Sequence, residues 1–278
     1  MVTRKFGRTL LYLGLIVGGF FYIYPFLWMV SASFKTLPEF ARGGLSLIPQ
    51  TIHWQNYLIA WREAEFSRYF LNTVALATIP TITSLISTSM AGYALATRRF
   101  PGRKIYIGGA VVMMFLPHGL TVIPVFMLIH KLGLLHTLLG VMLPSMGGTL
   151  MQALFFLGYY SSISTGAKTL EEAARVDGAG FFQTYWRIMM PLGRPMFATL
   201  GILAFISGWN NFYWPLVISL GDPKLRTLPV GLYAFRGEHI TEWTLLCAGT
   251  TMALIPIILL FLFFQRYIIE GLAGAIKM

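Results

Sequence analysis

Long stretches without charged residues dominate the pattern of polar and apolar positions along this chain. A helix needs about 20 apolar residues to cross the hydrocarbon core of a bilayer, and six charge-free intervals reach that length. They are 9–34, 69–97, 105–130, 132–167, 195–221 and 243–265. Because these runs are continuous and do not alternate in segments of about 10 residues, a membrane β-barrel is disfavoured. The pattern predicts an all-α membrane protein with six transmembrane helices.

Proline, glycine and polar residues trim these intervals to narrower helices. The predicted helices cover about 10–32, 69–97, 105–129, 138–160, 195–220 and 244–265. Proline removes a backbone donor and can bend a helix inside a membrane, so we expect a bend near Pro117 in the third helix. Pro144 and Gly147-Gly148 are expected to interrupt the fourth. In the first outer loop, Trp54 to Phe66 predicts a short helix at the membrane surface.

Domain organisation is simple, because the sequence contains no internal repeat and no separate soluble segment. Residues 1–278 are therefore expected to form a single membrane domain. The first apolar run, Leu10 to Val30, follows a basic segment and resembles a signal peptide. It is longer than the usual 7–15-residue apolar core of such a peptide, so we interpret it as a retained helix.

Charge distribution fixes the expected orientation. The chain is 56% hydrophobic and 11% charged, with a formal net charge of +11, whereas soluble domains carry about 25% charged residues. With the N-terminus inside, the inner segments hold 13 of the 21 basic residues and only 4 of the 10 acidic ones. This is the positive-inside pattern. It predicts cytoplasmic N- and C-termini and explains the basic balance without nucleic-acid binding.

Sequence signatures of enzymes are missing. The sequence has no Gly-x-x-x-x-Gly-Lys-Ser/Thr loop for ATP, no cluster with metal-ligand spacing and no nucleophile–base pattern. Cys247 is the single cysteine and lies in an apolar run, where a buried thiol is expected. No predicted span contains Asp, Glu, Lys or Arg, which disfavours an ion-coupled carrier. We therefore expect no catalytic residue, no metal and no cofactor in this chain.

A polar unit at about 161–194 separates the fourth and fifth predicted helices on the cytoplasmic side. Thr169 and Glu172 fit a capping box at the start of a short helix, and Asp177-Gly178 fits its end. An amphipathic second helix with an aromatic face follows, up to Pro191. The residues alone leave two interpretations: a hairpin on lipid headgroups, or a projection that fits the cleft of a partner protein.

A resemblance favours the second interpretation. The loop resembles the signature loop of permease subunits of ABC importers. That signature reads Glu-Ala-Ala, three residues, Gly, nine residues, Ile, one residue, a hydrophobic residue and Pro. Here it reads Glu172-Ala173-Ala174, Gly178, Ile188 and Met190-Pro191. The family usually has Leu where Met190 stands, a change that conserves apolar bulk.

The resemblance covers nearly the whole chain. Within the family, the chain is similar to the carbohydrate-uptake branch, in particular to the smaller permease of maltose-type importers. The segments that carry it are Asn56-Tyr57, 98–104, 209–216, 227–232 and 265–277. It implies a second related permease subunit, two cytoplasmic ATPase subunits that bind ATP and Mg²⁺, and an extracytoplasmic solute-binding protein. It also implies the cytoplasmic (inner) membrane of a prokaryote, with this chain as a multi-pass subunit in the lipid bilayer.

Site residues follow from the same resemblance. The loop would supply a coupling helix for the ATPases through Glu172, Ala173, Ala174, Asp177, Gly178, Ala179, Ile188 and Pro191. The tail near Gly274 to Lys277 is a second expected contact with the ATPases. The outer loops, including 221–242, would meet the solute-binding protein.

A solute pathway is the second candidate site. The candidate residues are Trp209, Asn210, Asn211, Trp214 and His118. Aromatic faces pack on the C–H surfaces of sugars, and amides bond their hydroxyls. The alternative is that the tryptophans and asparagines pack the fifth helix and hold a kink before Pro215, while His118 is a hydrogen-bonded structural residue.

The sequence is compatible with three functional hypotheses. The first is a permease subunit of an ATP-driven importer of a sugar or sugar-like solute, with glycerol phosphodiesters or polyols as further possible substrates. The second is a stand-alone channel or secondary carrier, which would work without an ATPase. The third is a membrane scaffold with a peripheral partner, which would carry no solute.

Overall fold

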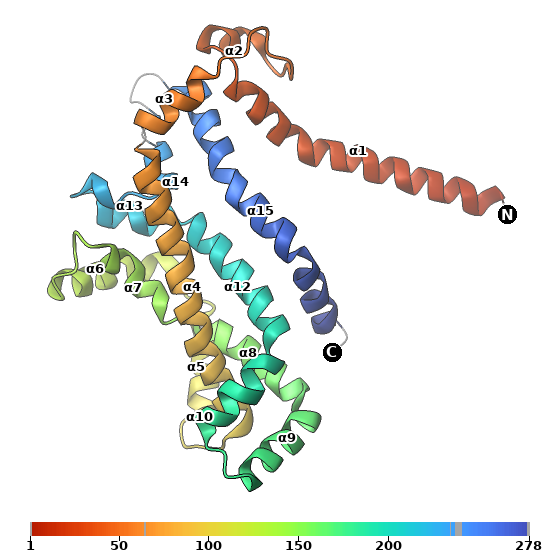
Figure 1. The fold of residues 1–278 in the computed structure, drawn as a ribbon, viewed down its shortest axis with the longest axis vertical. Helices are drawn as coiled ribbons and strands as arrows, with labels where there is room; N and C mark the ends of the chain where they lie inside the picture. Colours follow the sequence, from red (N-terminus) through yellow and green to blue (C-terminus); the bar gives the residue numbers. More distant parts are fainter. Residues whose placement is uncertain (1, 64, 234, 237–240, 277–278) are drawn as a thin grey trace. The chain divides into compact units, whose positions relative to one another are not determined.

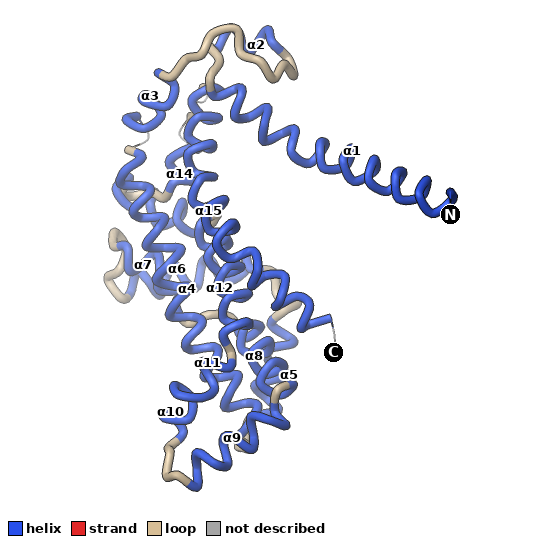
Figure 2. The backbone as a smooth tube through the Cα atoms, turned by 45° about the vertical axis from the view of Figure 1, so that its right-hand side comes forward, coloured by secondary structure: helices blue, strands red, loops and turns tan. Residues whose placement is uncertain are grey.

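The computed structural model describes the backbone of residues 2–63, 65–233, 235–236 and 241–276. This part of the chain is helical, with a single isolated β-bridge between Arg236 and Thr241 (Figure 2). It divides into two compact units. Residues 1–67 with 230–256 form the first unit, and residues 68–229 with 257–278 form the second.

The first unit contains α1 (Val2–Ser33), α2 (Leu37–Gly43) and α3 (Gln55–Glu63), as well as parts of α14 (Leu228–Tyr233) and α15 (Trp243–Ile276). The predicted first and sixth helices are confirmed in α1 and α15, and α3 lies where the short surface helix was predicted. The core of the unit joins Ala60 of α3 to Leu232, Phe235, Leu245 and Ala248. The side chains of Gly274 to Lys277, where a second contact with the ATPases was predicted, lie outside the described residues.

In the second unit, α4 (Phe66–Thr97) is one continuous helix that includes Pro80, as predicted for the second span. The predicted third helix, 105–129, is wrong as a single helix. The chain instead forms α5 (Arg103–Met113), the 3₁₀ turn η1 (His118–Thr121) and α6 (Val122–Lys131). Pro117 is extended, with φ −60° and ψ 129°. Because proline also disfavours the helical conformation of the residue before it, the helix breaks where only a bend was expected.

The predicted fourth helix is interrupted where the two glycines indicated. α7 (Leu138–Met146) and α8 (Leu150–Ser162) meet at 41°. Gly148 has φ +74°, a conformation that glycine adopts without steric cost. Thr149 then begins α8 with a capping box, since its hydroxyl accepts from the Gln152 amide and the Gln152 side chain accepts from the Thr149 amide.

The predicted fifth helix, 195–220, is also divided. It forms α12 (Arg194–Trp209) and α13 (Tyr213–Ser219), with a break at Asn210 to Phe212. Pro215 lies inside α13, so the break comes before this proline, where the alternative interpretation of the segment placed a kink. η3 (Pro223–Leu225) follows, and the amide of Asn72 in α4 donates to the carbonyls of Lys224 and Arg226 at 2.8 Å each.

Membrane-spanning length is reached by three helical segments of the described chain: Leu11–Ser33, Phe66–Thr97 and Trp243–Gln265. The count rises to five if the bent pairs Leu138–Met146 with Leu150–Ser162, and Phe181–Leu192 with Arg194–Trp209, are each one span. The all-helical membrane character is confirmed, and the figure of six spans stays a prediction.

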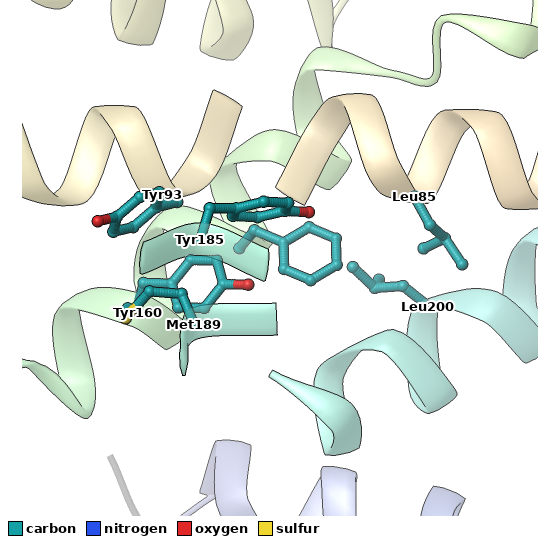
Figure 3. Close-up of a cluster of buried hydrophobic side chains, with 7 residues drawn as sticks. Leu85, Tyr93, Tyr160, Tyr185, Met189 and Leu200 are labelled. Carbon is teal, nitrogen blue, oxygen red and sulfur yellow. The ribbon is translucent and has the colours of Figure 1, made fainter. Parts of the chain in front are cut away.

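Two apolar clusters hold the second unit together. One, drawn in Figure 3, joins α4 and α8 to the segment 185–200 through Tyr93, Tyr160, Tyr185, Met189 and Leu200. The other packs Leu76 of α4 against residues of α6, α7 and α13. α4 therefore takes part in both clusters and runs through the second unit (Figure 1).

Candidate functional site

The polar unit at 161–194 folds as two helical arms that join at a tight turn. The first arm is α9 (Ser164–Val176). The second consists of α10 (Phe181–Thr184), the π-helical turn η2 (Tyr185–Met189) and α11 (Met190–Leu192). Thr169 was predicted to cap the first arm, and that prediction is wrong. α9 already begins at Ser164, with no side-chain cap, so Thr169 lies inside the helix.

The turn between the arms has the predicted form. Asp177 ends α9, and Gly178 adopts φ +83°. The Gly178 amide donates to the Arg175 carbonyl at 3.1 Å, and the Ala179 amide donates to the Ala174 carbonyl at 2.8 Å. These are the two hydrogen bonds of a Schellman motif. Nothing lies within 4 Å of the position of a Cβ on Gly178, so glycine is required there by the backbone conformation.

The predicted coupling residues divide between the surface and the interior. Glu172, Ala173, Asp177 and Gly178 are exposed, whereas Ala174 is buried and Ala179 is half-buried. Val176 was not predicted, yet it is 88% exposed. Position 176 follows position 172 by four residues and position 173 by three, so Val176 lies on the same face of α9 as these two residues. We call Glu172, Ala173 and Val176, with the turn Asp177-Gly178, the α9 face.

The second arm is anchored in the apolar cluster of Figure 3. Tyr185 is buried, and its hydroxyl lies 2.5 Å from the Ser89 hydroxyl of α4. Ile188 is half-buried against the same cluster, and Pro191 is exposed. Ile188 therefore holds the loop in place through packing, and is not part of the α9 face.

An ion pair that the sequence analysis missed ties the loop to the end of α4. Glu171 is 8% exposed, and one of its carboxylate oxygens lies 3.1 Å from Arg98 and 3.6 Å from Arg175. The Arg98 guanidinium also lies 5.6 Å from the centre of the Phe181 ring, which stacks on Tyr93. Arg98 thus contacts both arms. The spacing of Glu171 and Arg175 could have signalled their pairing, but nothing in the sequence pairs Glu171 with Arg98.

A cavity of about 230 Å³ in the second unit lies among α4, the α7–α8 break and the α12–α13 break. Its lining is uncharged and includes six hydroxyl or amide side chains that the sequence analysis did not select. They are Thr81, Ser84, Ser145, Thr149, Gln152 and Ser207. The available sequence signal was the three-residue spacing of Thr81 and Ser84, which places both hydroxyls on one face of α4. A Cβ on Gly148 would come within 2.5 Å of Thr88 Cγ2, so glycine lets the α7–α8 break approach α4 closely.

Of the predicted pathway residues, only Asn211 lines this cavity. Trp209 is 2% exposed and packs against Phe70 and Phe205. The indole nitrogen of Trp214 donates to the Val141 carbonyl at 3.0 Å, and Asn210 is exposed. These contacts are of the kind that the alternative interpretation, packing of the fifth helix, expects of the two tryptophans. The side chain of His118 lies outside the described residues.

Comparison with known proteins gives the family. The model of the family described as binding-protein-dependent transport system inner membrane component matches residues 85–273. The arabinooligosaccharides transport system permease protein AraQ of Halalkalibacterium halodurans is 35% identical over 272 residues, which cover 96% of each chain. The trehalose/maltose transport system permease protein MalG of Thermococcus litoralis is 32% identical over 273 residues, which cover 97% of each.

A solved structure agrees with these relatives. It is described as a bacterial ABC transporter involved in the import of the acidic polysaccharide alginate. One of its chains matches with a TM-score of 0.81 at 28% identity, over 95% of this chain and 96% of that one. The resemblance that was drawn from the loop at 172–191 is thereby confirmed at the level of the family. This chain belongs to the binding-protein-dependent transport system inner membrane components.

Proposed function

We propose that this chain is a permease subunit of an ABC importer that carries a sugar or sugar-like solute across the cytoplasmic membrane of a prokaryote. The observation that carries the proposal is the α9 face: an exposed, small and partly apolar surface that ends in a Schellman turn. The relatives of this chain include permease proteins named for arabinooligosaccharides and for trehalose and maltose. Its partners would be a second permease subunit, two ATPase subunits that bind ATP and Mg²⁺, and a solute-binding protein.

In this proposal the α9 face docks in a cleft of an ATPase subunit. Glu172 and Asp177 supply charge at the rim of the contact, and Ala173 and Gly178 allow a close approach of the two backbones. Ala174, Ala179, Ile188 and Pro191 shape the loop and support that face. Movement of α9 would then reach α4 through the pair of Glu171 and Arg98, which lie 3.1 Å apart.

The cavity beside the two helix breaks is our candidate for part of the solute pathway. Hydroxyl and amide groups such as Thr81, Gln152 and Asn211 can exchange hydrogen bonds with the hydroxyls of a sugar. Uncharged lining suits a neutral solute better than a phosphodiester, for which charged donors would be expected. Trp209 and Trp214 would support the wall of the pathway by packing.

For the topology we propose a single membrane domain, 1–278, with six spans and both termini in the cytoplasm. The third span would be the broken helix of α5 and α6, and the loop at 161–194 would lie between the fourth and fifth spans. Single cysteines at Asp222 and Gly102 distinguish the two orientations. A membrane-impermeant thiol reagent added outside should label position 222 and spare position 102; labelling of 102 alone would overturn the orientation.

The direct test of function starts with tagged purification in mild detergent and mass spectrometry of the proteins that accompany the chain. We expect an ATPase and a second permease. The purified complex is then placed in proteoliposomes with its solute-binding protein, and uptake of a labelled oligosaccharide is measured with and without ATP. Uptake that needs no ATP would contradict the proposal and favour a channel or carrier, and a complex without uptake of any sugar would favour another substrate.

A further inference from the structure

The loop after α2 is unusual in composition and exposure. Residues 43–54, which we call the α2 loop, contain no Asp, Glu, Lys or Arg. Four of their large apolar side chains are highly exposed: Leu45 at 71%, Ile48 at 81%, Ile52 at 61% and Trp54 at 63%. Single exposed apolar residues are ordinary on protein surfaces. Four within ten positions, with no charge among them, form a patch that indicates a binding partner.

The backbone of this loop is bonded from within the first unit. The indole nitrogen of Trp28 donates to the Gly44 carbonyl at 3.1 Å, and the hydroxyl of Tyr24 donates to the Leu45 carbonyl at 2.6 Å. The ammonium of Lys35, a side chain that is 1% exposed, donates to the Ser46 carbonyl at 2.5 Å. Three successive carbonyls thus have partners that do not depend on water. A loop that enters a lipid environment needs such partners, because unpaired peptide groups are costly there.

The same bonds place the loop beside a membrane span. Tyr24 and Trp28 belong to the candidate span Leu11–Ser33 and precede its end by nine and five residues. At 1.5 Å per residue these positions are about 14 and 8 Å along the helix from Ser33. Gly44 and Leu45 therefore lie alongside the last turns of α1 and not beyond them. In Figures 1 and 2 the chain after α2 folds back over that end of α1.

The apolar surface continues from the loop onto α1. Around the two bonding residues, α1 exposes Tyr22 at 83%, Ile23 at 56% and Phe26 at 55%. These side chains are those that a spanning helix presents to lipid or to another helix. The α2 loop extends this surface sideways at the level where a bilayer interface would meet the span.

We propose that the α2 loop is a lipid-binding element that inserts Leu45, Ile48 and Ile52 into the boundary between headgroups and acyl chains. The leaflet is the one at the Ser33 end of α1. Trp54 would lie at headgroup level, where tryptophan is enriched. The element would steady α1, the least buried span of the described chain, against the bilayer. This inference requires only that α1 crosses the membrane, and it does not depend on the substrate or on the ATPases.

A docked protein is the competing occupant of this surface. Interfaces between separately folded proteins have a polar rim around their apolar centre. The α2 loop offers three carbonyls that are already bonded and has no charged side chain of its own. The neighbouring charges precede it on α2: Glu39, whose carboxylate accepts from the Gln50 amide at 2.6 Å, and the exposed Arg42. Lipid fits these features better.

The test measures the depth of the loop in the intact complex in lipid nanodiscs. With Cys247→Ser as background, a nitroxide is attached to Ile48→Cys or, as a control on the preceding helix α2, to Arg42→Cys, which is also exposed. Power saturation compares collisions with oxygen, which partitions into lipid, and with a water-soluble nickel chelate. We expect oxygen to dominate at position 48, at a depth of about 5–10 Å, and nickel to dominate at position 42.

Equal access of the nickel chelate to positions 48 and 42 would overturn the proposal. Protection of position 48 that arises only after the solute-binding protein is added would also overturn it, and would assign the surface to that protein. If the Ile48→Cys complex does not assemble, Ile52→Cys gives the same readout, with the same two outcomes against the proposal.

Discussion

One guanidinium nitrogen of Arg98 lies 3.1 Å from a carboxylate oxygen of Glu171. This pair connects the residue that follows α4 with the buried side of α9. Arg98 also lies over the Phe181 ring of the second arm. A single side chain at the end of α4 therefore contacts both arms of the loop, which lets α4 and the loop move together.

Replacement of Arg98 by alanine should loosen the loop from α4. Loss of one partner of a fully buried pair costs about 3–5 kcal/mol. Since the Arg98 side chain is 38% exposed, we expect about 1–2 kcal/mol, seen as a lower midpoint of thermal unfolding in detergent. Solute-stimulated ATPase activity of the complex should fall as well.

A double-mutant cycle tests whether the two residues act as a pair. Arg98→Ala and Glu171→Gln should together cost less than the sum of the single changes, because each already removes the same interaction. Arg99→Ala, at the neighbouring exposed position, should leave the unfolding midpoint unchanged. Additive effects of Arg98→Ala and Glu171→Gln would show that the pair does not couple α4 to α9.

Replacement of Gly178 by valine should uncouple transport from ATP hydrolysis. A β-branched residue is strained at φ +83°, so the Schellman turn and the α9 face should be lost while the membrane spans still form. We expect ATP-driven uptake to fall at least tenfold with normal amounts of protein in the membrane. Gly133→Val is the control, since Gly133 has φ +67° and equally open surroundings but lies outside the loop. Similar loss of uptake in both variants would count against a specific role of the turn.

Gly148→Ala should disturb the cavity more than Gly147→Ala. A Cβ at position 148 would lie 2.5 Å from Thr88 Cγ2 and 3.0 Å from Ser84 Cβ, whereas nothing lies within 4 Å at position 147. Such overpacking costs about 1–3 kcal/mol, and alanine is also strained at the φ of +74° that Gly148 adopts. The unfolding midpoint of the Gly148 variant should therefore fall, while that of the Gly147 variant, at φ −72°, stays near wild type. Equal midpoints would mean that the α7–α8 break can move away from α4.

Asn211→Ala should impair uptake of a sugar, and Asn210→Ala should not. Asn211 lines the cavity, whereas the Asn210 amide donates to the Ile206 carbonyl of its own helix. Loss of one solute hydrogen bond of about 1–1.5 kcal/mol corresponds to roughly a tenfold rise in the solute concentration that half-saturates uptake. The kinetics of labelled-solute uptake provide the measurement, and the reverse ranking of the two variants would remove the cavity from the pathway.

The sequence predicted the parts of this structure that depend on local signals. Continuous apolar runs gave α1, α4 and α15, and Asp177-Gly178 gave the turn of the loop, because a helix end with glycine has a recognisable form. The α12–α13 break was predictable only as the kink before Pro215 that the alternative interpretation of this segment included. No proline or glycine marks Asn210 to Phe212, and the break follows a tryptophan that packs on Phe70 of α4.

The candidate site was predictable only in part, for the same physical reason. The exposed residues of α9 belong to one contiguous motif, but Arg98 and Glu171 are far apart in the sequence and meet through folding. The polar lining of the cavity comes from α4, α7, α8 and α12. Apart from the spacing of Thr81 and Ser84 on α4, single hydroxyls in these apolar helices give no distinctive local pattern. Trp209 and Asn211 were equal candidates for the pathway in the sequence. Only the packing of the folded chain shows that Trp209 is buried whereas Asn211 lines the cavity.

The uncharged lining of the cavity has an electrical consequence. Its side chains are hydroxyls, amides and apolar groups, so neither a neutral solute in the cavity nor these side chains carry charge through the membrane field. Membrane potential does work only on charge that moves through it. Passage of a neutral solute through this part of the proposed pathway should therefore not depend on membrane potential, which uptake in polarised and depolarised vesicles would test.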